Sequence, residues 1–65
     1  MSARKRLKKM QEFMERDLEF AKHMANLYRL ETERDPSNLK AAEFYNFYSA
    51  ETDVLQRLID RFTNK

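Results

Sequence analysis

The chain has 65 residues, of which 42% are hydrophobic and 37% are charged, and its formal net charge is +2. This length allows one domain at most, in a size range where oligomerisation is a common remedy for a small core. Cysteine and glycine are absent, which excludes disulfides, thiolate metal ligands and glycine-rich phosphate loops. We therefore expect a protein that is not an enzyme and takes no cofactor, metal or small-molecule substrate.

A basic cluster precedes the first acidic residue, Glu12, and consists of Arg4, Lys5, Arg6, Lys8 and Lys9. No apolar segment of signal-peptide length follows it, and no apolar run is long enough to span a bilayer. We therefore expect a cytoplasmic protein that does not act at a membrane. The cluster has two interpretations: a solubilising segment 1–9 that frays, or a docking patch for nucleic acid, an acidic protein surface or, least favoured, anionic lipid.

Two segments place their apolar residues on one broad face at helical spacing. In the first, about residues 3–34, the face comprises Leu7, Met10, Phe13, Met14, Leu18, Phe20, Ala21, Met24, Ala25, Leu27 and Tyr28. In the second, about residues 36–63, it comprises Phe44, Tyr45, Phe47, Tyr48, Val54, Leu55, Leu58, Ile59 and Phe62. The pattern predicts two long amphipathic helices.

The sequence Asp35-Pro36-Ser37-Asn38 predicts the turn between these helices. Pro36 disfavours the helical conformation at Asp35, so the first helix should end near residue 34. We expect Asp35 to be the N-cap of the second helix and Pro36 its first residue. The helices have similar lengths, so the predicted fold is all-α: an antiparallel two-helix hairpin that forms a single domain over residues 1–65.

Each apolar face is wider than one neighbouring helix can cover, because a helix with a single partner buries only a narrow strip. We therefore expect the hairpin to dimerise into a four-helix bundle. Asp17 and Glu51 fall within the two apolar faces, where an unpaired buried carboxylate costs several kcal/mol. We expect them to form buried polar contacts that fix the register of the bundle. Exposure at an edge, or pairing with an external basic partner, remains open. A metal site is disfavoured because no Glu-x-x-His motif accompanies them.

The densest group of aromatic residues is Phe44, Tyr45, Phe47 and Tyr48, which we expect to anchor a partner. The predicted function is therefore a small regulatory or adaptor protein that acts through protein–protein interaction by a helix face. The alternative is a hairpin dimer that binds RNA or DNA through the basic cluster, similar in size and layout, but in no motif, to the Rop family of plasmid RNA regulators.

Overall fold

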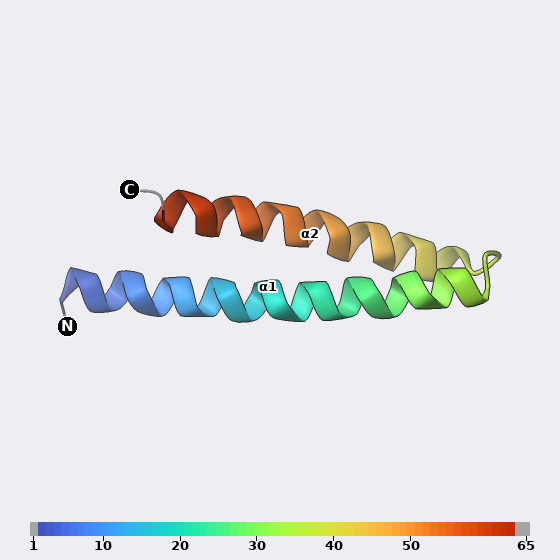
Figure 1. Cartoon of the computed structure of the whole chain (residues 1–65), viewed down its shortest axis with the longest axis horizontal. Helices are drawn as coiled ribbons and strands as arrows, with labels where there is room; N and C mark the ends of the chain where they lie inside the picture. Colours follow the sequence, from blue (N-terminus) through green and yellow to red (C-terminus); the bar gives the residue numbers. More distant parts are fainter. Residues whose placement is uncertain (1, 64–65) are drawn as a thin grey trace.

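The computed structural model describes residues 2–63 as two helices joined by a tight turn. Helix α1 spans Ala3–Arg34 and helix α2 spans Leu39–Thr63. They run antiparallel and pack against each other, diverging gradually away from the turn, and α1 extends beyond the end of α2 (Figure 1). The predicted all-α hairpin is therefore confirmed. Residues 1, 64 and 65 lie outside the described residues, so the predicted domain limits of 1–65 are described only over 2–63.

The contact between the helices follows a heptad spacing of alternating three- and four-residue steps. On α1 the buried and half-buried positions with this spacing are Gln11, Met14, Leu18, Ala21, Ala25, Tyr28 and Thr32, and Met24 and Glu31 beside them are also half-buried. The matching positions of α2 and its N-cap are Asn38, Ala41, Tyr45, Tyr48, Thr52, Leu55, Ile59 and Phe62, and Ala42, Ser49 and Gln56 beside them are also half-buried. We call these two strips the seam. This spacing is typical of coiled-coil packing, in which each helix presents one strip to its partner.

Small residues let the helices approach closely in the seam. Ala21 and Ala41 are each only 3% exposed, and they share the buried core with Leu18 and Ile59. Because alanine adds little bulk, the two backbones can come together around these positions. The seam therefore buries few large side chains, and much of the apolar surface of the hairpin remains outside it.

The turn departs from the prediction at the start of the second helix. The carboxylate of Asp35 accepts hydrogen bonds from the backbone N–H and the hydroxyl of Ser37, at 3.2 and 2.6 Å. Asn38 instead caps α2, because its side-chain oxygen accepts the backbone N–H of Ala41 at 3.1 Å. Helix α2 thus begins at Leu39 rather than at Pro36. Asp35 leaves the helical conformation at the end of α1, with φ −136° and ψ 86°, as expected for a residue before proline.

The first turn of α1 is helical from Ala3 onward, capped by Ser2, whose hydroxyl accepts the N–H of Lys5 at 3.3 Å. No acidic residue lies in that turn, so its bases oppose the helix macrodipole without local compensation. At the other end of α1, Arg34 donates to the Glu31 carboxylate, which raises the pKa of Arg34 above its usual value.

The molecule is thin and elongated, with extents of 51 × 19 × 13 Å. Its radius of gyration is 15.0 Å, whereas a compact domain of this length is expected to have about 11 Å. A thickness of 13 Å is close to the diameter of a single helix. The core of residues 2–63 is therefore a single thin strip, in which Leu18, Ala21, Ala41 and Ile59 are the buried residues.

Candidate functional site

A second apolar strip lies beside the seam on each helix. Each of its positions directly precedes a seam position in the sequence. On α1 it contains Met10, Phe13, Phe20, Met24 and Leu27, and on α2 it contains Phe44, Phe47, Val54 and Leu58. We call these residues together the apolar face. Its aromatic members are strongly exposed: Phe13 is 62%, Phe20 57% and Phe47 56% accessible to solvent. Exposure of this extent over one contiguous set of large side chains is typical of an interaction surface.

Both strips lie on the same side of the hairpin. One residue corresponds to about 100° around a helix, and in an antiparallel pair the positions just before the seam flank the same edge. The aromatic contacts agree with this geometry, because Phe20 of α1 packs edge-on against Tyr48, at 6.1 Å between ring centroids. Phe44 of α2 stacks on Tyr28 at 5.1 Å. The apolar face is therefore a single surface shared by the two helices.

The four aromatic residues predicted as partner anchors do not act together. Phe44 and Phe47 are exposed on the apolar face. Tyr48 is half-buried in the seam, where its ring stacks on Tyr28 at 6.0 Å and meets Phe47 at 5.1 Å. Tyr45 is half-buried and lines the opposite side of the hairpin. Only Phe44 and Phe47 are thus placed to contact a partner on the apolar face.

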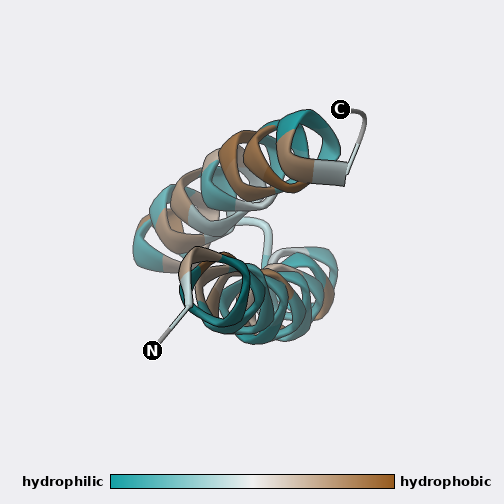
Figure 2. Ribbon diagram, turned by 90° about the vertical axis from the view of Figure 1, so that its left-hand side faces the viewer, coloured by the Kyte–Doolittle hydropathy of each residue, from teal (hydrophilic) through white to brown (hydrophobic). Residues whose placement is uncertain are grey.

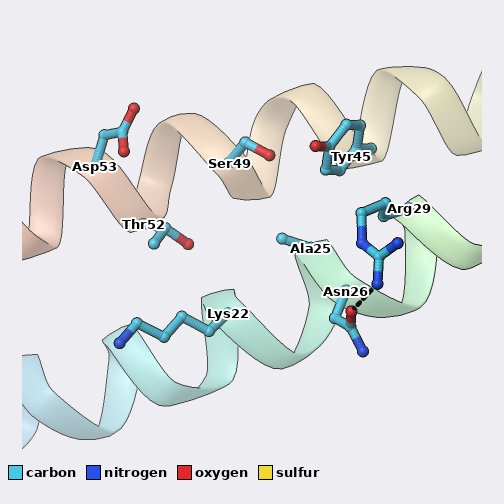
Figure 3. Close-up of a pocket in the computed structure, with 8 residues that line it drawn as sticks. All are labelled: Lys22, Ala25, Asn26, Arg29, Tyr45, Ser49, Thr52 and Asp53. Atoms are coloured by element: carbon cyan, nitrogen blue, oxygen red, sulfur yellow. Dashed lines mark hydrogen bonds between the residues drawn. The ribbon is translucent and has the colours of Figure 1, made fainter.

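That opposite side forms a shallow groove of about 330 Å³, whose lining residues are mostly of polar types (Figure 3). It is lined by Lys22, Ala25, Asn26, Arg29, Tyr45, Ser49, Thr52 and Asp53, and we call it the polar groove. Arg29 is already bonded there, to Asn26 at 2.7 Å and to Glu33 at 2.8 Å. The contrast between this groove and the apolar face gives the hairpin two unlike sides.

Asp17 and Glu51 both occupy positions in the strips of the apolar face, and both are exposed in the single chain. Their predicted role in fixing bundle register concerns an assembled form and stays a prediction. Within residues 2–63, no group of three or more histidine or acidic side chains lies close enough together to hold a metal ion.

The basic cluster projects beyond the end of α2 (Figure 1). All of its residues, Arg4, Lys5, Arg6, Lys8 and Lys9, are exposed and helical. We call this segment the basic overhang. The end of α1 nearest the viewer in Figure 2 is correspondingly hydrophilic, while the hydrophobic segments are most evident along α2. Over the described residues, neither helix has an apolar stretch that meets the length and composition needed to cross a membrane.

Sequence reasoning found the breadth of the apolar surface but did not assign Phe13, Phe20 or Val54 to a docking site. The signal that identifies them is the repetition of the same offset on both helices, which shows that two strips are present rather than one wide face.

No protein-family model, no curated protein and no solved structure matches the chain. The functional argument therefore depends on the geometry of the apolar face, the polar groove and the basic overhang.

Proposed function

We propose that the chain is a small, non-enzymatic adaptor or regulatory protein that acts by protein–protein interaction through its apolar face. The observation that supports this most directly is that most of the exposed large apolar residues, Phe13, Phe20 and Phe47 among them, share one side of the hairpin, although Leu30 and Leu39 are exposed elsewhere. Large aromatic side chains contribute much contact area at a low entropy cost, so they are effective interface anchors.

We further propose that, in the absence of another partner, the apolar face associates with a second copy to form a four-helix bundle. The seam and the second strip are about 100° apart on each helix, close to the right angle between two neighbours in a square arrangement. A second hairpin supplies the two additional helices that this arrangement needs.

The exposed area supports the same assembly. The chain exposes 5513 Å², whereas a compact monomer of 7.9 kDa is expected to expose about 4,400 Å². The excess of about 1,100 Å² exceeds the roughly 800 Å² that one partner contributes to a standard stable interface. Burying this excess area against a second copy would bring the accessible surface area per chain to the value expected for a compact monomer.

The adaptor function is tested by capture from native lysate with three forms of the chain. The first is the wild type, the second carries Phe20→Ser and Val54→Ser on the apolar face, and the third carries Asn26→Ser and Ser49→Ala in the polar groove. We expect one or more proteins to be captured by the wild type and the groove variant, with or without nuclease, and to be lost with the face variant. Equal capture by all three forms would contradict the proposal.

A second candidate function follows from the basic overhang, whose side chains are exposed beyond α2 and free of steric cover. Nucleic-acid phosphates are one class of ligand that such a cluster binds. In that case affinity should fall with salt, with a log–log slope of about −0.7 to −0.9 for each phosphate neutralised. Replacing Arg4, Lys5, Arg6, Lys8 and Lys9 with alanine should abolish the binding, and RNA or DNA binding that persists in this variant excludes the role.

A further inference from the structure

Two carboxylates interrupt the apolar face at its centre. Asp17 continues the strip of α1 between Phe13 and Phe20, and Glu51 continues the strip of α2 between Phe47 and Val54. Both are exposed, and within residues 2–63 neither takes part in an ion pair. The face therefore combines aromatic and methionine side chains with two negative charges that have no ion-pair partner among residues 2–63.

No base lies at the centre of this face. Over residues 2–63, the bases that fall in the same two strips are Arg6, Arg34, Lys40 and Arg61, and all four lie toward the ends of the helices. The basic overhang does not neutralise the carboxylates either, because Lys9 precedes Asp17 by about 12 Å along the helix axis. Exposed charges at that separation are largely screened at physiological ionic strength.

A partner that covers the face must remove these carboxylates from water. An isolated buried charge costs several kcal/mol, whereas a well-placed cation offsets much of that cost. A second copy brings another Asp17 and another Glu51 but no central base, so self-association leaves the charges uncompensated. A partner with lysine or arginine among its apolar residues would pair them.

We propose that the apolar face docks an amphipathic helix of another protein whose apolar strip carries lysine or arginine at two positions. This inference rests on the proposed adaptor function and names the chemistry of its partner. The second copy is then the weaker of two competitors for the same surface. Methionines Met10 and Met24 suit a surface that accommodates helices of different sequence, because their side chains repack easily.

The spacing of the two cations follows from the register of the hairpin. Tyr28 stacks on Phe44 and on Tyr48, and Phe20 packs against Tyr48. Taken together, these contacts place Asp17 and Glu51 about one helical turn apart along the hairpin, or roughly 6 Å. A helix lying between α1 and α2 would meet both carboxylates with basic residues three or four positions apart, since such residues project from the same face.

The test uses the full chain and two synthetic amphipathic helical peptides. Each peptide has about 18 residues, which as a helix is long enough to lie along the centre of the apolar face. One peptide carries lysine at two apolar-strip positions four residues apart, and the other carries glutamine there. We expect the lysine peptide to bind at least tenfold more tightly by fluorescence anisotropy. Scrambled peptides of the same composition should bind neither strongly nor selectively.

Two variants locate the effect. D17N/E51Q removes the charges of the face and should reduce the lysine-to-glutamine affinity ratio to about one. E12Q/E43Q removes one carboxylate from each helix outside the face and should leave the ratio unchanged. Equal affinity of the two peptides for the wild type, or a ratio that survives in D17N/E51Q, would overturn the inference.

Failure of this inference can be distinguished from failure of the proposed function. If neither peptide binds but sedimentation shows a dimer that D17N/E51Q tightens, the second copy is the occupant and the adaptor surface stands. If the chain binds no peptide and stays monomeric in every form, both proposals fail.

Discussion

Asn38 is the N-cap of α2, and its side-chain oxygen makes the hydrogen bond that marks the start of that helix. Its side-chain oxygen accepts the N–H of Ala41 in a partly buried position. Asp35 directly precedes Pro36 and is the predicted N-cap, but its carboxylate accepts hydrogen bonds from Ser37 within the turn instead. Both residue types are good N-caps, so the sequence leaves two candidates. The closure of the turn against α1 selects between them.

Replacing Asn38 with alanine should lower the free energy of unfolding by about 1 kcal/mol, because the N–H of Ala41 loses its acceptor. The measurement is urea denaturation followed by circular dichroism. Asn38→Asp retains a capping oxygen and should recover most of the loss. An Asp35→Ala variant that is destabilised more than Asn38→Ala would show that Asp35 is the principal cap.

Asp17 and Glu51 are the residues whose environment changes most if the apolar face is covered. In D17N/E51Q we expect the dissociation constant of the homodimer to fall by about tenfold or more at pH 7, because two uncharged amides per chain are desolvated at lower cost. Sedimentation equilibrium measures this, with E12Q/E43Q as the charge-matched control. A dimer weakened by D17N/E51Q would instead show that these carboxylates form essential pairs, as the bundle-register hypothesis requires.

At the scale of the helix, α1 and α2 each carry two strips that serve different purposes. The seam buries Ala21 and Ala41 together with Leu18 and Ile59, whereas the apolar face leaves large side chains such as Phe20 and Phe47 exposed. A helix can bury small residues and expose large ones only if something beyond its own hairpin accounts for the large ones. This distribution, rather than total hydrophobicity, is the argument for an interaction surface.

The seam should be intolerant of added volume. We expect Ala21→Leu to destabilise the hairpin by about 1–3 kcal/mol, because a larger side chain pushes apart helices that approach closely there. Ala50→Leu, at an exposed position on the outer side of α2, is the matched control and should change stability by less than about 0.5 kcal/mol. Thermal unfolding of the two variants decides, and equal melting temperatures would contradict the close packing of the seam.

Much of the fold could be predicted because helical periodicity and Pro36 determine two helices and one turn. The division of the apolar residues between the seam and the apolar face could not be predicted, because Tyr45 and Phe44 are adjacent in sequence and both lie within the same broad arc. Which of them meets α1 depends on the rotation of each helix in the pair, a tertiary property. The structure places Tyr45 beside the polar groove and Phe44 on the apolar face.

At the scale of the whole molecule, the charge distribution bears on how two hairpins would assemble. The basic overhang extends past α2 at one end only. Two copies packed with these ends together would concentrate positive charge at one pole, whereas an antiparallel arrangement separates the clusters by many Debye lengths. We therefore expect the antiparallel arrangement. Because the chain has no cysteine, single-cysteine variants can test it directly.

The midpoint of the apolar face lies near Phe20 on α1 and Val54 on α2, so an antiparallel two-fold axis passes close to both. Val54→Cys should then form a disulfide-linked dimer readily under mild oxidation. Arg6→Cys should not link to itself, since the two overhangs lie at opposite poles. Efficient self-linking of Arg6→Cys, with none for Val54→Cys, would indicate that the basic ends lie together.

The mass of the chain in solution tests the central claim most directly, because we propose that a second copy covers the exposed apolar face. Sedimentation equilibrium at pH 7 and tens of micromolar protein should give about twice the 7.9 kDa chain mass, with a melting temperature that rises with concentration. The Phe20→Ser/Val54→Ser variant should sediment as a monomer. A wild-type chain that remains a 7.9 kDa monomer, with a melting temperature independent of concentration, would contradict the account.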